Sequence, residues 1–204
     1  MNDNPFVTDS EDSPYLKHHY QEKNWYRGKE VIDVNYFMVD PETILMGWGA
    51  YTKDKGYDYQ WQKDLFSPIN KPSDEHKKAF SIWVLPKYVN GEQNVEHGAC
   101  LWQRHSYGEY TGFQQMGNCF YEASKLPENQ NKLPIIKYIS SESISIGMGS
   151  TSIPKFELAG FKERPDNFVI PAWYGSEEDE SNSPIQDPSS SDAQSTFIDD
   201  EIPF

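Results

Sequence analysis

The chain has 204 residues, with 18 Lys and Arg against 32 Asp and Glu, which gives a formal net charge of −14. Residues 1–14 carry four acids and residues 175–204 carry nine, without bases, so the intervening body is almost neutral. A mean hydropathy of −0.80 and the lack of any long apolar run leave no candidate transmembrane helix, and the acidic start resembles neither a signal nor a transit peptide. We expect a soluble, cytoplasmic protein with no membrane partner.

Both ends of the chain are predicted to be disordered. Residues 1–14 are polar and contain proline, and residues 175–198 consist mostly of Ser, Pro, Asp and Glu. Neither segment has enough apolar surface to offset the entropy of ordering. Residues 15–174 are long enough to bury a core without disulfides, so Cys100 and Cys119 are expected to be reduced thiols.

Short segments rich in β-branched and aromatic residues predict a mainly β body. Turn signals such as Asp40-Pro41 and Asn90-Gly91 separate these segments, and helical spacing between Glu109 and Lys125 predicts one short helix. About seven strands with one helix indicate an antiparallel barrel or sandwich. The predicted elements, in chain order, are strands at 30–39, 44–51, 57–63, 80–88 and 98–107, the helix at 109–125, a strand at 135–146, a Gly/Ser-rich loop at 147–152 and a strand at 155–161.

Aromatic residues are unusually frequent in the body, which holds 27 of the 30 Phe, Trp and Tyr residues. Proteins that bind single-stranded nucleic acid combine rings that stack on bases with basic groups that follow the phosphates. One segment has this pattern on a single strand face, with lysines on the adjoining turn: Lys53, Lys55, Tyr57, Tyr59, Trp61 and Lys63. Further candidates are Trp25, Tyr26, Arg27 and Lys29, then Trp83 with Lys87, and Trp102 with Arg104. The alternative for each ring is a place in the core or in a cross-strand pair.

The sequence predicts no metal site, no cofactor site and no catalytic site. His97, Cys100, His105 and Cys119 lack the paired spacing of a zinc knuckle. The Gly/Ser-rich stretch 147–152 has no lysine of a phosphate-binding loop. No nucleophile, base and orienting group occur in a recognised arrangement, so we expect a protein that is not an enzyme and needs no cofactor.

An apolar tip follows the acidic linker at the C-terminus. Phe204 offers a ring and an α-carboxylate that a basic pocket can hold, and Pro203 restricts the residue before it. The predicted partner-binding residues are Asp199, Asp200, Glu201, Ile202, Pro203 and Phe204. This ending, DDEIPF, resembles the acidic C-terminal tip of bacterial single-stranded DNA-binding proteins, which typically end Asp-Asp-Asp-Ile-Pro-Phe after a flexible linker.

The resemblance implies an OB-fold body, residues 15–174, that binds single-stranded DNA. It also implies that the tip, residues 199–204, recruits proteins of DNA replication, recombination and repair and competes with DNA for the binding groove. The body is longer than a usual OB module and the linker lacks Gly and Gln richness. These departures favour a divergent phage-encoded relative in the host bacterial cytoplasm, either a monomer or a small homo-oligomer.

The sequence therefore predicts sequence-independent, non-enzymatic binding of single-stranded DNA by an OB-fold-like antiparallel β-barrel with one short helix and a disordered acidic C-terminal tail. One alternative is an interaction protein that mimics a host tip and occupies partner pockets without binding DNA. Another is a nuclease or helicase accessory whose carboxylates bind Mg²⁺.

Overall fold

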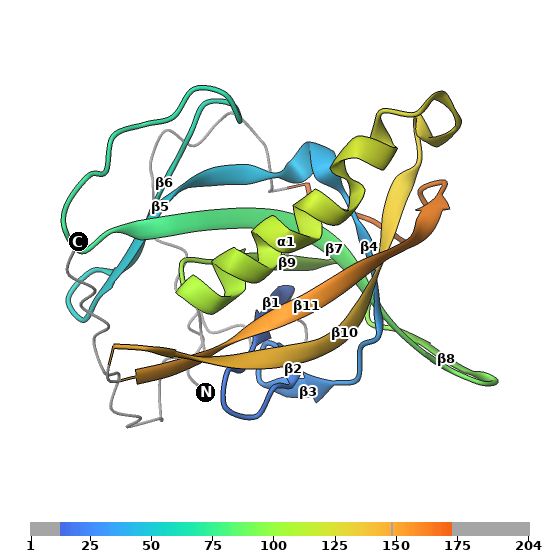
Figure 1. Cartoon of the computed structure of the whole chain (residues 1–204), viewed down its shortest axis with the longest axis horizontal. Helices are drawn as coiled ribbons and strands as arrows, with labels where there is room; N and C mark the ends of the chain where they lie inside the picture. The colour runs from blue at the N-terminus through green and yellow to red at the C-terminus, as the bar shows by residue number, and fades with distance from the viewer. Residues whose placement is uncertain (1–12, 148, 173–204) are drawn as a thin grey trace, which may run out of the picture.

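Eleven strands form one mixed sheet in the computed structural model, which describes residues 13–147 and 149–172 (Figure 1). The predicted linker 175–198 and tip 199–204, and all but the end of the predicted leader, lie outside the described residues. The elements are β1 (Tyr15–His18), β2 (Trp25–Arg27), β3 (Glu30–Ile32), β4 (Tyr36–Val39), η2 (Pro41–Thr43), β5 (Leu45–Thr52), β6 (Gly56–Trp61), β7 (Lys77–Asn90), β8 (Gln93–Glu96), β9 (Cys100–Arg104), α1 (Tyr107–Ser124), η3 (Pro127–Asn129), β10 (Leu133–Ile146) and β11 (Gly149–Lys162).

The long strand β7 organises the sheet. It pairs with β5 and β4 through its first and last parts, and it also pairs with β9 and β8. The hairpin β10–β11 follows β4, while β6 pairs with β5, and β1, β2 and β3 follow β9. Because β1 and β9 run parallel, the sheet is mixed, and the expectation of a purely antiparallel structure is wrong at this pair. In the described part of the chain the strand order runs from β11 to β3 without closing.

Several predicted boundaries need correction. The predicted strand 30–39 is divided into β3 and β4, and the predicted loop 147–152 contains the start of β11. The turn at Asp40-Pro41 is confirmed, since Asp40 caps η2 by accepting the Glu42 N–H at 3.2 Å. Within the described residues, the mainly β composition and the one predicted α-helix are confirmed as well.

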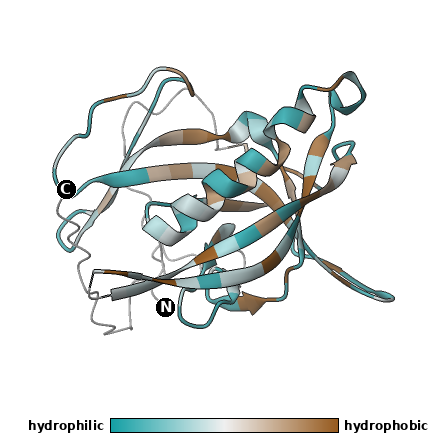
Figure 2. Ribbon diagram, in the orientation of Figure 1, coloured by the Kyte–Doolittle hydropathy of each residue, from teal (hydrophilic) through white to brown (hydrophobic). Residues whose placement is uncertain are grey.

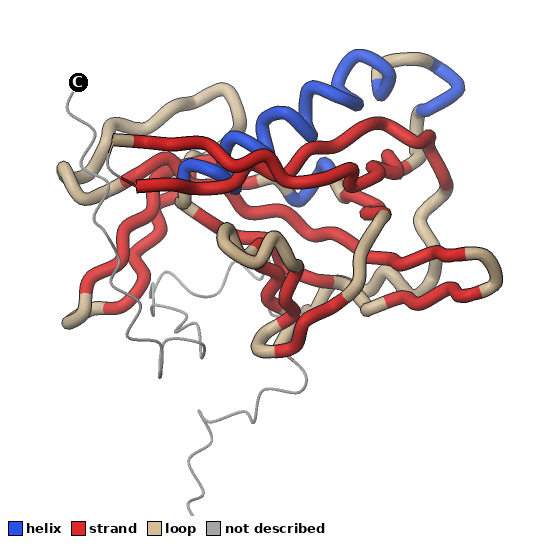
Figure 3. The backbone as a smooth tube through the Cα atoms, turned by 60° about the horizontal axis from the view of Figure 1, so that its bottom comes forward, coloured by secondary structure: helices blue, strands red, loops and turns tan. Residues whose placement is uncertain are grey.

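The helix α1 begins two residues before the predicted start and packs on β11 through two glycines. Ser106 is its N-cap. A Cβ at Gly108 would lie 2.3 Å from the Ser152 carbonyl oxygen, and one at Gly112 would lie 2.5 Å from Pro154 Cγ. These glycines weaken an isolated helix, yet here they allow its close approach to the strand. Figure 3 shows α1 lying along one side of the strands.

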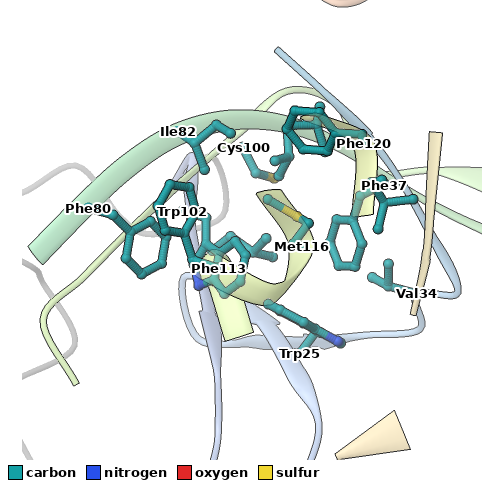
Figure 4. Packing of buried hydrophobic residues seen from close by; sticks show 14 of the residues in the cluster. Trp25, Val34, Phe37, Phe80, Ile82, Cys100, Trp102, Phe113, Met116 and Phe120 are labelled. Atoms are coloured by element: carbon teal, nitrogen blue, oxygen red, sulfur yellow. The ribbon is translucent and has the colours of Figure 1, made fainter. Parts of the chain in front are cut away.

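The main core lies between α1 and the strands and is rich in aromatic rings (Figure 4). Phe113 of α1 stacks on Phe80 with centroids 4.3 Å apart, and Trp102 meets Phe80 edge-on at 4.8 Å. Much of the high aromatic content is thus used in packing. Hydrophobic and hydrophilic positions follow one another along β10 and β11, as Figure 2 shows, because successive side chains point to opposite faces, whereas residues 79–86 of β7 are all buried.

A second, smaller cluster on the sheet is covered by a segment that we call the strap, residues 163–172. Phe168 of the strap packs with Trp83 and Leu101. Arg164 forms an ion pair with the buried carboxylate of Asp40, and its guanidinium lies 4.9 Å from the centre of the Phe168 ring. These contacts fix the strap to the sheet. Within the described ranges, no helix has the length and apolar character needed to cross a membrane.

Candidate nucleic-acid interface

Three aromatic rings of β6 form what we call the ring row: Tyr57, Tyr59 and Trp61. The centroids of Tyr57 and Tyr59 are 6.0 Å apart with planes at 9°, and those of Tyr59 and Trp61 are 5.1 Å apart at 6°. All three side chains are half-buried. The prediction that they share one strand face is confirmed, because alternate residues of a strand point the same way.

Two glycines of β5 make room for the ring row. Gly49 pairs with Tyr59, and Gly47 pairs with Trp61. A Cβ at position 49 would lie 2.7 Å from Tyr59 Cε1, and a Cβ at position 47 would lie 2.0 Å from the carbonyl oxygen of Gln60. Side chains at these positions would therefore displace the ring or the paired backbone.

Sequence reasoning missed two residues of this face, Tyr51 and Lys77. Tyr51 pairs with Tyr57 across the hairpin, is 47% exposed, and has its centroid 4.9 Å from the Tyr57 centroid. Lys77 pairs with Gly49 from the other side and is exposed. Alternation along β5 could have identified Tyr51 once the turn fixed the register. Lys77 was missed because the predicted strand begins at residue 80.

His105 supports the ring row from the end of β9. Its ring lies edge-on to Tyr57 and Tyr59 at 5.9 and 5.8 Å, and its Nδ1 lies 3.3 Å from the Tyr59 hydroxyl oxygen. Burial lowers the pKa of His105 to about 4, and the charges of Arg104 and Lys77 contribute in the same direction. The imidazole is therefore neutral at pH 7 and packs as a ring rather than acting as a phosphate-binding cation.

Lysines lie at both ends of the ring row and beside its centre. Lys53 and Lys55 are exposed on the turn that precedes β6, and Lys63 is exposed just after it. Lys77 lies beside Gly49, the register partner of Tyr59. None of the salt bridges found among the described residues involves these four ammonium groups. Their charges are thus available to an anionic backbone that follows the row.

The opposite face of the β5–β6 hairpin is covered by the connection between β6 and β7, residues 62–76. The indole N–H of Trp48 donates to the Ile69 carbonyl at 3.0 Å. His76 of the connection places Nε2 3.2 Å from Asp58 Oδ2. Because this connection packs on the face of Trp48 and Asp58, it does not cover the ring row, which points the other way.

The three other predicted tryptophans are corrected from nucleic-acid contacts to core residues. Trp25, Trp83 and Trp102 are 2%, 0% and 1% exposed. Trp25 meets Trp102 edge-on at 5.3 Å in the main core, whereas Trp83 belongs to the cluster under the strap. Their rings cannot stack on bases without opening the fold.

Three of the basic residues predicted to accompany those tryptophans, Arg27, Lys87 and Arg104, hold protein groups instead. Arg27 donates to the carbonyls of Ser13 and His97, and Lys87 pairs with Glu96 at 2.9 Å. Tyr26 donates to Glu22, and Lys29 is exposed on the turn before β3. Arg104 lies 3.6 Å from Glu109. The structure therefore brings together only the group on and beside β6.

Glu109 is a buried carboxylate that sequence reasoning did not single out. It accepts hydrogen bonds from the indole N–H of Trp102 at 3.0 Å, the backbone N–H of His18 at 2.9 Å and the hydroxyl of Ser106 at 3.0 Å. The Ser-x-x-Glu spacing of a helix capping box was the available signal. Its bonds join the start of α1 to β1 and β9, so its role is structural.

A second buried polar group links β1 to β10. His18 Nε2 lies 2.7 Å from Ser141 Oγ, which lies 2.8 Å from the Tyr138 hydroxyl oxygen. Burial lowers the pKa of His18. No carboxylate among the described residues bonds its Nδ1, so this Ser–His pair lacks the orienting acid of a catalytic triad.

Two cysteines and the potential metal-ligating side chains were the remaining candidates for reactive chemistry. Cys100 and Cys119 are free thiols, and burial raises the pKa of Cys100 to about 12. Across residues 13–147 and 149–172, no three His, Cys, Asp or Glu side chains gather as metal ligands.

Comparisons with known proteins add no relative. No protein-family model, curated protein sequence or solved structure matches the chain. The geometry around the ring row is therefore the basis for assigning a function.

Proposed function

We propose that this protein binds single-stranded DNA without sequence preference and without catalysing a reaction. The observation that carries the proposal is the ring row, in which three near-parallel rings lie on one strand face. Stacking of a base on an aromatic side chain contributes roughly 1–3 kcal/mol. Every base has a π-face, so the binding is tolerant of sequence.

The spacing of the rings supports a single strand over a duplex. Successive rings are 6.0 and 5.1 Å apart, whereas successive nucleotides of a duplex strand rise by about 3.4 Å. The three rings stack on one another, so bases do not lie between them, and a strand that contacts the solvent-exposed side of the row must be extended with its bases unstacked. In a duplex the bases are already stacked and paired, so their faces are not available.

The charge pattern supports a polynucleotide over an uncharged ligand. Lys53 and Lys55 precede the ring row, Lys63 follows it, and Lys77 lies beside its centre. A phosphate backbone passing along the row would meet an ammonium group at each stage and release condensed counterions. The near-neutral body can thus bind a polyanion despite the chain's net charge of −14.

The fold and the tip each have a part in the proposed function. We assign the curled sheet the role of an OB-like scaffold, in which the β5–β6 hairpin grips the strand as OB-fold loops do. The tip, residues 199–204, recruits replication, recombination and repair proteins and competes with DNA for the ring row. This role suits a phage-encoded protein in the bacterial cytoplasm, either a monomer or a small homo-oligomer.

Fluorescence anisotropy of labelled oligonucleotides tests the proposal. The full chain should bind single-stranded DNA more tightly than duplex DNA of the same sequence. Trp61→Ala should bind more weakly, while Tyr121→Ala, which removes an exposed ring of α1, should bind like the native chain. Failure of the folded native chain to bind single strands would reject the proposal and favour a protein that acts through its tip alone.

A further inference from the structure

The aromatic rings on the ring-row face of the β5–β6 hairpin differ in how much of each ring a ligand can reach. Tyr59 has a stacked ring on each side, with centroids 6.0 Å from that of Tyr57 and 5.1 Å from that of Trp61. These three side chains are half-buried, whereas Tyr51 on β5 is 47% exposed. Of the four rings, Tyr51 therefore offers the largest accessible fraction to a base.

The strand register places Tyr51 on the same face as the ring row. Tyr51 pairs directly with Tyr57 across the hairpin, and residues directly opposite each other in a pair of strands project to the same side. Their ring centroids are 4.9 Å apart with planes at 53°, so Tyr51 does not continue the stack. Its ring lies at an angle beside Tyr57, at the end of the row nearest the turn.

The turn next to Tyr51 carries two cations on an ordered backbone. Thr52, the last residue of β5, pairs with Gly56 and closes the hairpin. The backbone N–H of Lys55 donates to the Thr52 hydroxyl oxygen at 3.2 Å. Lys53 and Lys55 are exposed, and the Lys53 Cα is within about 7 Å of the Tyr51 Cα, two residues away. The most exposed ring of this face thus lies beside groups that can bind phosphate.

We propose that Tyr51 stacks on a base of the bound single strand and forms the turn-side end of the binding site, with Lys53 and Lys55 on the adjacent phosphates. This inference rests on the proposed function of the ring row. The strand then runs from Tyr51 along the exposed side of the row to Trp61 and Lys63. Because Tyr51 is already exposed on a paired strand, its ring needs no rearrangement before binding.

The test compares Tyr51→Ala with the native chain in anisotropy titrations of a labelled oligothymidylate of about 16 nucleotides. Affinity should fall about fivefold or more, as expected when one base no longer stacks. Tyr121→Ala is the matched control, because it removes a tyrosine that is 57% exposed on α1. The control should bind like the native chain.

Two further variants separate base stacking from support of the hairpin by a cross-strand pair. Tyr51→Phe keeps the ring and should bind like the native chain. Tyr51→Val suits a strand and keeps apolar contact with Tyr57, but it has no ring face, so it should keep the native melting temperature and bind as weakly as Tyr51→Ala. Weak binding by Tyr51→Phe would show that the hydroxyl, and not the ring face, makes the contact, and would overturn the proposal.

The outcomes also separate this inference from the proposed function. Native affinity in Tyr51→Ala or in Tyr51→Val, while Trp61→Ala weakens binding, would overturn the role of Tyr51 and leave the proposed function intact. A folded native chain that binds no single strand would overturn both.

Discussion

The ring of Tyr59 lies over the backbone of Gly49 on the paired strand. A Cβ at position 49 would come within 2.7 Å of Tyr59 Cε1 and 3.0 Å of His105 Cβ. The absence of a side chain at Gly49 therefore allows the middle ring of the row to lean across the hairpin toward His105.

We predict that Gly49→Val weakens single-strand binding, because the new side chain displaces Tyr59. Valine suits a strand, so the change in binding reports the ring position, while crowding lowers the free energy of unfolding by roughly 1–3 kcal/mol. The matched control is Gly117→Ala on α1, where a Cβ would meet nothing within 4 Å. Anisotropy and thermal melting measure both effects. Native affinity in a folded Gly49→Val variant would show that the arrangement of the rings does not matter for binding.

Truncation of Trp61 in the ring row should weaken DNA binding, whereas truncation of Trp102 in the core should lower stability. Trp61→Ala should reduce single-strand affinity by roughly 1–3 kcal/mol with little change in melting temperature. Trp102→Ala should reduce the free energy of unfolding by about 3–5 kcal/mol, because Trp102 is 1% exposed in the main core. Paired melting and binding curves distinguish the two. If Trp61→Ala mainly lowers the melting temperature, its ring belongs to the core and the site is wrongly assigned.

The contrast between Trp61 and Trp102 shows which features of the site could be predicted from the sequence. Alternation along β6 placed Tyr57, Tyr59 and Trp61 on one face, since this relation depends only on local strand geometry. Whether a face is covered depends on distant segments: α1 and β10–β11 enclose Trp102, and the strap covers Trp83. Those packing relations have no local sequence signal.

The register between strands that are distant along the chain could not be predicted from the sequence either. The parallel pairing of β1 with β9 brings together Tyr15 and Leu101, which are far apart along the chain. Likewise, Lys77 joins the site only because β7 pairs with β5 in a register that sets it beside Gly49. The helix, by contrast, was predictable because its apolar spacing is local.

The lysines at the start of the ring row should determine the salt dependence of binding. Lys53→Gln and Lys55→Gln should each reduce the slope of log affinity against log salt by about 0.7 for every phosphate of a single strand that the variant no longer neutralises. Lys125→Gln is the matched control, because Lys125 pairs with Glu122 on α1. Anisotropy titrations over a range of salt concentrations give the slopes. Unchanged slopes in both turn variants would exclude these lysines from the path of the phosphate backbone.

Stability should fall as the pH decreases from about 6.5 toward about 4. The pKa of His105 is lowered from its ordinary value of 6.5 to about 4, mainly by burial, so the unfolded chain binds a proton in this range that the folded chain does not. This favours unfolding by up to about 1.4 kcal/mol per pH unit, while stability is fully present above the unfolded pKa. Denaturant unfolding of the native chain and of His105→Gln at several pH values measures the difference. His18 has a pKa shift in the same direction, so the variant should lose only part of the slope. An identical slope in both proteins would contradict the role given to His105.

The tip should act independently of the ring row. Phe204→Ala should leave single-strand binding almost unchanged but abolish association with proteins that recognise bacterial single-strand-binding tips, because it removes the ring expected to enter their pocket. Asp199→Ala and Asp200→Ala should act more mildly and mainly at low salt, as charges at the rim of an interface do. The measurement is anisotropy of a labelled peptide covering residues 195–204, titrated with such proteins, with the Phe204→Ala peptide as control. Equal affinity of the two peptides, or none for either, would remove the resemblance as a basis for partner recruitment, while leaving the test of the ring row unaffected.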